Sequence, residues 1–247
     1  MFLGVTLKAS GQEATPVSQA AVVWPEYEGG KFHIYYSARF ESGWSDKQVL
    51  SDSVKDVAMP SVARGYDGVS WVVWSACGEN QSSLFYRYST RAGWSEAEEI
   101  PTNLRHNSAP SILVDKDHRP WIVWQGNDGK NQSDIFFSRW DGKGWEPASK
   151  VNRGDDSPDV LPLIGTKSNG VLWVSWYGFD GTRYNPYCSE WAYDQSEAVW
   201  RWSDEIECDA DNLFKVQINR GSKGRSPGFR RIFRTRRRRA SMWGGVG

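Results

Sequence analysis

The 247-residue chain contains 24 Gly, 15 Trp, 10 Tyr and 10 Phe, and aromatic residues make up 14% of it. This length is enough for one good-sized hydrophobic core or two small ones. Short twisted strands packed on both faces need this many aromatic rings, whereas a helical protein of this size rarely does. No apolar run approaches the roughly 18 residues of a membrane-spanning helix, and the start of the chain, Met1 to Lys8, is too short and uncharged to predict a signal peptide.

The formal net charge of +0 combines two different regions. Residues 213–247 contain eleven Lys and Arg and no acidic residue, whereas residues 1–212 carry 30 acidic and 19 basic residues. We therefore expect residues 1–212 to form the folded body and residues 213–247 a basic tail that is disordered or atypical. The tail suits an arm that contacts phosphates or acidic surfaces, and it equally suits an altered or truncated continuation of the body.

A repeat of about 50 residues organises the body. A tryptophan closes four apolar runs at spacings of 50, 50 and 52 residues: Trp24, Trp74, Trp124 and Trp176. A proline stands fourteen residues before three of them: Pro60, Pro110 and Pro162. A Gly-Trp pair follows each of the first three runs at Gly43-Trp44, Gly93-Trp94 and Gly144-Trp145, with Trp200 as the fourth, less regular member.

Each unit divides into four short apolar segments, which in the third unit span 109–115, 120–125, 133–140 and 144–151. Segments of this length and composition predict strands. The run from Trp121 to Trp124 is apolar at every position, as in a strand buried on both faces. Four-stranded units of this period are typical of a β-propeller. A β-sandwich is the competing fold.

We therefore expect an all-β propeller of four-stranded antiparallel blades, with most tryptophans in the core. The expected blades are 1–51, 52–101, 102–152 and 153–208, and residues 212–219 could begin a partial fifth. A partial or strained ring is favoured over a well-closed ring of four. An open arc would expose aromatic blade faces and so drive self-association.

The aligned repeat resembles the BNR, or Asp-box, repeats of the bacterial neuraminidase (sialidase) superfamily. The resemblance covers residues 15 to about 202 and is clearest in Pro110–Trp124 (PSILVDKDHRPWIVW) followed by Asp134–Trp145 (DIFFSRWDGKGW). It implies a propeller fold, a carbohydrate ligand, and an extracellular or periplasmic location. Tachylectin-like and fungal fucose-lectin propellers, which only bind, are similar in blade length and Gly-Trp turns.

The chain departs from that family in the residues that would carry catalysis. The box itself is approximated only by Ser138, Asp141, Gly142 and Trp145, and in the family it is a structural staple. Catalytic members need an arginine triad, a Tyr/Glu pair and an aspartic acid. The arginines here are scattered without a pattern that selects three.

The loops that enter the first strand of each blade, and those that join the second and third strands, lie on one face of a propeller. Polar residues stand three or four positions before each proline in the entering loops: Asp56, His106, Asn107 and Asp159. The other loops supply Glu79, Asn127, Asp128 and Asp180, with Tyr177 and Tyr184 nearby. Such a carboxylate- and amide-rich rim suits sugar hydroxyls, although the same residues also serve ordinary turns.

The leading hypothesis is a non-catalytic propeller module that recognises a glycan or another extracellular ligand. The alternatives are a sialidase-like glycoside hydrolase, in which an acidic residue of the axial rim such as Asp56 or Asp159 acts as acid or base, and a protein-interaction scaffold. His106 and the pair Asp155-Asp156 could also serve acid–base chemistry. The sequence leaves open whether the chain is an enzyme.

No cofactor or metal site is expected. Asp115-x-Asp117 and Asn127-Asp128-Gly129 lack the ligand count of a calcium loop, and the three cysteines form no CxxC pair. Cys188 and Cys208 fall on neighbouring strands of one hairpin, but a regular register would leave them several residues out of alignment. We therefore expect Cys77, Cys188 and Cys208 to be small buried residues rather than disulfide partners.

Overall fold

The computed structural model describes residues 20–51, 56–127, 132–152 and 156–208. Every regular element in these ranges is a β-strand, and none of the described residues forms a helix that could cross a membrane. The strands form four antiparallel sheets, one for each repeat. The all-β class and the antiparallel units predicted from the sequence are therefore confirmed, while blade count and ring closure stay predictions.

The sheets use the strands in chain order. The first sheet contains β1 (Ala20–Glu28), β2 (Lys31–Phe40), β3 (Gly43–Trp44) and β4 (Gln48–Val49). The second contains β5 (Asp56–Arg64), β6 (Ser70–Cys77), β7 (Ser82–Thr90), β8 (Gly93–Trp94) and β9 (Glu98–Glu99). The third contains β10 (His106–Val114), β11 (Pro120–Asn127), β12 (Asp134–Arg139) and β13 (Ser149–Lys150). The fourth contains β14 (Asp159–Thr166), β15 (Leu172–Phe179), β16 (Tyr184–Asp194), β17 (Val199–Trp202) and β18 (Ile206–Glu207).

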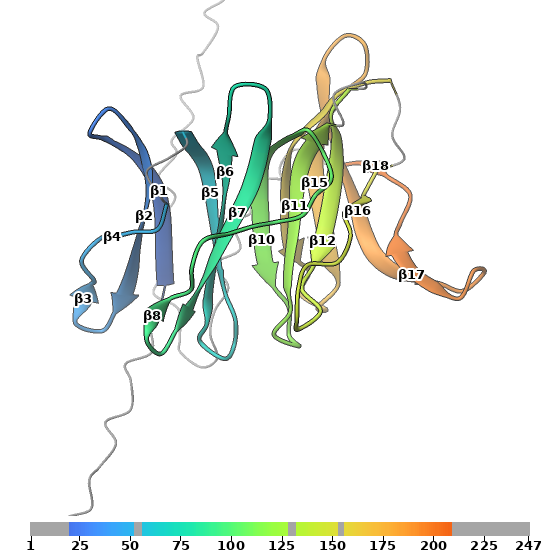
Figure 1. Ribbon diagram of the computed structural model, residues 1–247. Coiled ribbons are helices and arrows are strands. Elements are labelled where there is room, and N and C mark those ends of the chain that lie inside the picture. Colours follow the sequence, from blue (N-terminus) through green and yellow to red (C-terminus); the bar gives the residue numbers. More distant parts are fainter. Residues whose placement is uncertain (1–19, 52–55, 128–131, 153–155, 209–247) are drawn as a thin grey trace, which may run out of the picture.

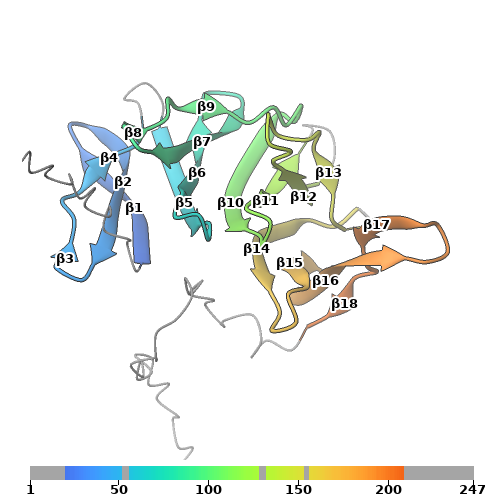
Figure 2. The ribbon, with the colours of Figure 1, turned by 90° about the horizontal axis from the view of Figure 1, so that it is seen from below.

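The four sheets follow one another around an arc, with the first and fourth at its two ends (Figure 2). Strands β5, β10 and β14 lie on the concave side, and the short outer strands lie on the convex side. The first sheet begins with β1, the Trp24 strand, so the predicted inner strand of the first unit falls outside the described residues. The predicted tail, 213–247, and the start of a fifth unit also lie outside them.

The regular spacing of the repeat reflects one kind of contact between neighbouring sheets, which the chain makes three times. We call the side of a sheet that faces the preceding sheet its rear face, and the side that faces the next sheet its front face. In each later sheet, the tryptophan at the Gly-Trp position lies on the rear face and packs on an aromatic ring of the preceding sheet. The ring centroids lie 4.8 Å apart in Tyr36–Trp94, 5.6 Å in Tyr86–Trp145 and 5.5 Å in Phe137–Trp202.

Three of the four tryptophans that define the repeat fill the spaces between sheets, as the sequence predicts, whereas Trp24 in the first described sheet does not. Trp74, Trp124 and Trp176 are 2%, 0% and 1% exposed, each in a separate hydrophobic cluster between two sheets. Strand β6 is buried along its whole length except for Cys77. Burial on both faces explains why these runs are apolar at every position instead of alternating.

Each inner strand contains a β-bulge just before its proline. Met59, Ala109 and Leu161 have φ angles of 50°, 49° and 54°, and the strand register shifts at these points. Residues other than glycine rarely adopt this backbone region. The same strained geometry in three units shows that it belongs to the repeat, and the extra residue changes which side of the strand each side chain faces.

The fourth Gly-Trp position is held by Trp202 and not by Trp200, which corrects the sequence-based alignment. Trp202 pairs with Trp191 across β16 and β17 and is 7% exposed, whereas Trp200 is 59% exposed. The β16–β17 hairpin is longer than its counterparts and projects from the arc (Figure 1). Because this hairpin is longer, Trp202 does not stand at the position that the spacing of the other units predicts.

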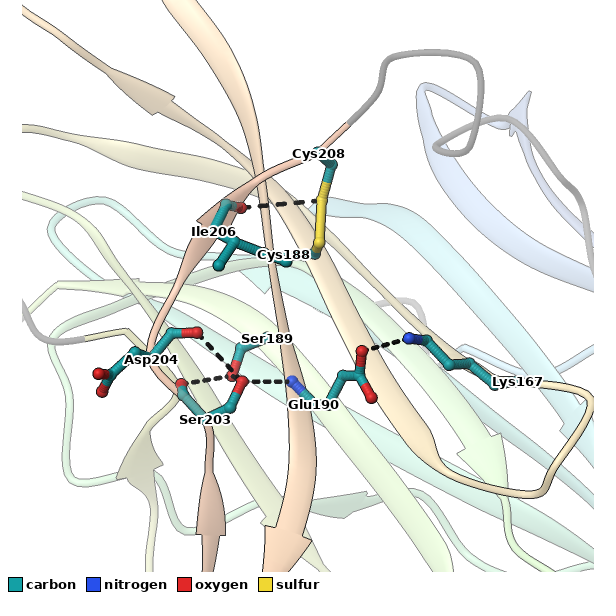
Figure 3. Close-up of a disulfide and its surroundings, with 8 residues drawn as sticks. All are labelled: Lys167, Cys188, Ser189, Glu190, Ser203, Asp204, Ile206 and Cys208. Atoms are coloured by element: carbon teal, nitrogen blue, oxygen red, sulfur yellow. Dashed lines mark hydrogen bonds and ion pairs between the residues drawn. A yellow bond between two sulfur atoms is a disulfide. The ribbon is translucent and has the colours of Figure 1, made fainter.

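Cys188 and Cys208 form a disulfide (Figure 3) and Cys77 is exposed, which together correct the expectation of three buried, unpaired cysteines. The Cα atoms of the disulfide lie 5.8 Å apart. A single regular register would have separated them, but β16 pairs with two pieces, β17 and then β18, with an irregular passage through residues 203–205 between them. That passage brings Ile206 opposite Cys188, and the Cys208 amide donates to the carbonyl of Pro186 at 2.8 Å.

Candidate functional site

The two sets of loops singled out in the sequence meet on one face. The guanidinium Nε of Arg105, in an entering loop, donates to the carbonyl of Asn80, in the β6–β7 turn, at 3.0 Å. One unit further on, the Asp159 amide donates to the carbonyl of Ser133 at 2.8 Å. The β6–β7 and β15–β16 turns lie at the upper edge of the sheets in Figure 1. We call this side the loop face.

Three of the predicted site residues are exposed on the loop face: Asp56, Glu79 and His106. His106 lies directly opposite the half-buried Asn127 in the β10–β11 pairing, so the fold places these two predicted residues side by side. Asp128 lies outside the described residues. The exposed acids and the imidazole remain free to face a ligand in this arrangement.

Asp180 is also exposed, but its carboxylate is engaged in its own turn. It accepts hydrogen bonds from the amides of Thr182 and Arg183, both at 2.8 Å, and from the side chain of Asn185 at 2.7 Å. The two backbone amides are the main reason that the pKa of Asp180 is lowered. The rings of Phe179 and Tyr184 lie on either side of this turn with centroids 5.2 Å apart, and Tyr184 is 49% exposed.

Asn107 lies inside the protein, although the sequence placed it on the rim. It is 1% exposed, and its amide nitrogen donates to the carbonyls of Ser82 and Leu104 at 2.8 and 3.1 Å. Its side-chain oxygen accepts a hydrogen bond from the indole of Trp124 at 2.9 Å. Asn107 therefore joins the third sheet to the second and fixes the orientation of a core tryptophan.

Asp159 has the equivalent position in the fourth sheet and is 7% exposed. Its carboxylate accepts a hydrogen bond from the indole of Trp176 at 3.0 Å and from the amide of Asn152 at 2.5 Å. Asn152 also donates to Asp134, whose carboxylate pairs with Lys150 at 2.6 Å. This buried network joins the third and fourth sheets beneath the loop face.

The Asp134–Asn152–Lys150 part of that network was missed in the sequence. The signal that could have found it is positional, because His33 and Ser83 stand at the place in their units that Asp134 has in the third unit. A polar residue at one strand position of three units indicates a partner on the neighbouring sheet.

The opposite face carries turns whose carboxylates bond to the backbone. Asp141, in the residual Asp-box, accepts hydrogen bonds from the amides of Lys143 and Gly144, and these lower its pKa. Asp115 accepts from the amide of Arg119 and the indole of Trp121, both at 2.9 Å. Both acids stabilise turns. Across the described ranges there is no group of three or more His, Cys, Asp or Glu placed to hold a metal ion.

No protein-family model matches this chain, and no curated protein matches it. Solved structures do share its fold. A protein of unknown function from Dyadobacter fermentans DSM 18053 superposes with a TM-score of 0.54 at 10% identity over 71% of this chain. The chain spans 58% of the length of that protein.

An α-L-arabinanase from Penicillium chrysogenum, solved in complex with arabinobiose, superposes with a TM-score of 0.51 at 12% identity, covering 77% of this chain and 68% of the arabinanase. A mutant sialidase from Streptococcus pneumoniae reaches a TM-score of 0.46 at 12% identity, covering 66% of this chain and 26% of the sialidase. The two superpositions above a TM-score of 0.5 show a shared β-propeller fold and do not show membership of the sialidase superfamily.

Proposed function

We propose that this chain is a propeller module that binds glycans through its loop face. The observation that carries the proposal is the grouping of exposed Asp56, Glu79 and His106 with the Phe179–Tyr184 ring pair on one face. Carboxylates and imidazoles bond to sugar hydroxyls, while exposed aromatic rings receive the C–H face of a sugar. The arabinanase that shares the fold holds a disaccharide, arabinobiose.

In this proposal the predicted site residues divide into two roles. Asp56, Glu79, His106 and Asn127, together with Asp128 and Asp180, would contact the ligand or shape the loops that do. Asn107 and Asp159 are positioning residues, because their polar atoms bond to the indoles of Trp124 and Trp176.

The second candidate is a glycoside hydrolase that uses an exposed acid of the loop face, such as Asp56, as acid or base. The fold shared with an arabinanase supports it. Among the described residues, the arginines in the loops of this face are Arg105 and Arg183. The arginines of the chain follow no pattern that selects the triad of catalytic sialidases, and this supports binding over sialidase chemistry.

A glycan array, run beside turnover assays with fluorogenic sialosides and arabinofuranosides, tests these two candidates. We expect binding without turnover, weakened by Tyr184→Ala and Asp56→Asn and unchanged by Asp117→Asn on the opposite face. Turnover abolished by Asp56→Asn would establish the hydrolase instead. Silence in both assays would reject both candidates and leave a protein-interaction scaffold. Asp159→Asn is a poor test, because it disturbs a buried network.

A further inference from the structure

Two hairpin tips at opposite ends of the arc share one sequence pattern. Residues Tyr27–Phe32 have the sequence YEGGKF, and residues Phe179–Tyr184 have the sequence FDGTRY. Each segment contains, in order, an aromatic residue, an acid, a glycine, one further residue, a base and a second aromatic residue. Each also begins three residues after the repeat tryptophan of its unit, Trp24 or Trp176. The pattern therefore occupies the same turn of the first and fourth sheets.

The two aromatic residues of each tip lie directly opposite each other across the hairpin. Tyr27 pairs with Phe32 in the strand register, and in the fourth sheet Phe179 pairs with Tyr184. The ring centroids lie 5.2 Å apart in both pairs, at interplanar angles of 65° and 52°. Tyr27, Phe32 and Tyr184 are 64%, 44% and 49% exposed. Each tip thus presents two inclined rings to solvent, and we call these the first and the fourth ring pair.

The two sheets between these ends have small or polar residues where the rings stand. The second sheet pairs Cys77 with Ser82 at these positions. The third sheet has Asn127 three residues after its repeat tryptophan. The second sheet closes a turn of the same length without a ring, because the Gly78 amide donates to the carbonyl of Gln81 at 2.8 Å. Closure of the hairpin therefore does not explain the rings at both ends of the arc.

Both ring pairs lie on the loop face, one at each end of it. The β1–β2 and β15–β16 turns are at the upper edge of their sheets in Figure 1, and Figure 2 shows the first and fourth sheets at the ends of the arc. The exposed Asp56, Glu79 and His106 belong to the second and third sheets, between the ring pairs. Because stacked sheets pack about 10 Å apart, the ring pairs are separated by on the order of 30 Å along the arc.

Neither tip carries a net charge, because each holds one acid and one base. Lys31 lies opposite Glu28, which accepts a hydrogen bond from the Tyr35 hydroxyl. The Asp180 carboxylate accepts hydrogen bonds from the amides of its own turn and lies 3.9 Å from the guanidinium Nε of Arg183. The rings are therefore the groups that each tip offers to a ligand. An uncharged sugar suits them, because its C–H face packs on a ring, whereas a carboxylate or sulfate would meet no excess of positive charge there.

We propose that the loop face has two aromatic subsites, the first and the fourth ring pair, and that they bind one neutral polysaccharide chain at two points. This inference rests on the proposed glycan function and names the class of glycan. The hydroxyls of the sugars between the two points would donate to the carboxylates of Asp56 and Glu79. The second contact is intramolecular only for a chain long enough to span both subsites, so affinity should depend on chain length.

Calorimetric titration of the full chain with neutral arabino- and xylo-oligosaccharides of two to about ten sugar residues tests this proposal. We expect the longest members of the series that binds to do so roughly tenfold or more tightly than its disaccharide. Phe32→Ser and Tyr184→Ser are matched variants, because Ser82 holds their position in the second sheet. Each should remove the gain from chain length and leave the disaccharide bound at the other ring pair. Tyr66→Ser is the control, since Tyr66 is 63% exposed in the β5–β6 turn of the opposite face, and it should change neither result.

The possible results separate this inference from the proposed function. Binding that Tyr184→Ser abolishes and Phe32→Ser leaves unchanged at every chain length would keep the glycan function and overturn the contact at two points. Affinity that is independent of chain length, or higher for acidic oligogalacturonides than for the neutral series, would also overturn it. A melting temperature lowered by either variant with binding unchanged would assign the rings to hairpin stability instead. Binding of no glycan at all would reject the proposed function and this inference together.

Discussion

Asn107→Val removes a buried connection between the second and third sheets while keeping a side chain that the repeat already accepts. Val57 occupies the equivalent position of the second sheet and is 4% exposed. The substitution deletes three hydrogen bonds, to the Trp124 indole and to the carbonyls of Ser82 and Leu104. At about 1 kcal/mol for each, the free energy of unfolding should fall by about 3 kcal/mol.

For a chain of this size that loss corresponds to a melting temperature lower by about 10 °C. Circular dichroism during heating and urea denaturation measure it. Asn80→Ala is the control, because Asn80 is exposed on the loop face and its contact to Arg105 uses the backbone carbonyl. The control should change stability by less than about 0.5 kcal/mol.

The positioning role also predicts what Asn107→Val leaves intact. Below its lowered melting temperature, the variant should bind glycans as the unmodified chain does, because Asn107 is 1% exposed. Unchanged stability combined with lost binding would refute this reasoning and return Asn107 to the ligand site.

Three other measurements test the electrostatics and the covalent link. Cys208→Ser should lower the free energy of unfolding by about 3 kcal/mol, since the disulfide closes a sequence separation of 20 residues; Cys77→Ser, which alters an exposed cysteine outside any disulfide, should not. The pKa of Tyr86 is raised by burial and by its hydrogen bond to a carboxylate, so folding disfavours its ionised form and stability should fall as pH rises above 10.0. Tyr86→Phe should flatten that decline in alkaline denaturation curves, and an unaltered slope would contradict the assignment. The pKa of Asp180 lies below its ordinary 3.8, so its stabilisation of the turn should be lost as pH falls below that value; Asp180→Ala should speed hydrogen exchange at the Thr182 amide, and unchanged exchange would argue against the turn.

The repeat was readable in the sequence because its period comes from local chemistry. Trp74, Trp124 and Trp176 end strands that are buried on both faces, so apolar runs, turn residues and spacing all carry the same information. The placement of two sets of loops on one face also followed from the order of the strands within a propeller blade. The hydrogen bond from Arg105 to Asn80 confirms it.

Only half of the candidate site could be predicted. A difference of one residue in the distance from the proline decides whether a side chain is exposed or buried. Asp56 and His106 stand four positions before their prolines and are exposed, whereas Asn107 and Asp159 stand three positions before theirs and are buried. Alternate residues of a strand face opposite sides, but a strained bulge lies between these residues and the proline. Counting from the proline therefore could not show which side faces the loops.

The sequence by itself determined the fold class, the length of each unit and the residues that fill the spaces between sheets, because these depend on hydrophobic pattern and turn chemistry. The tertiary structure decided the Cys188–Cys208 bond and the exposure of Trp44 and Trp200. Each depends on which strands become neighbours: β16 pairs with two separate pieces, and the first sheet lacks a preceding sheet among the described residues (Figure 2). A side chain of given type is core or surface according to what packs against it, and that partner is set by the arrangement of whole sheets.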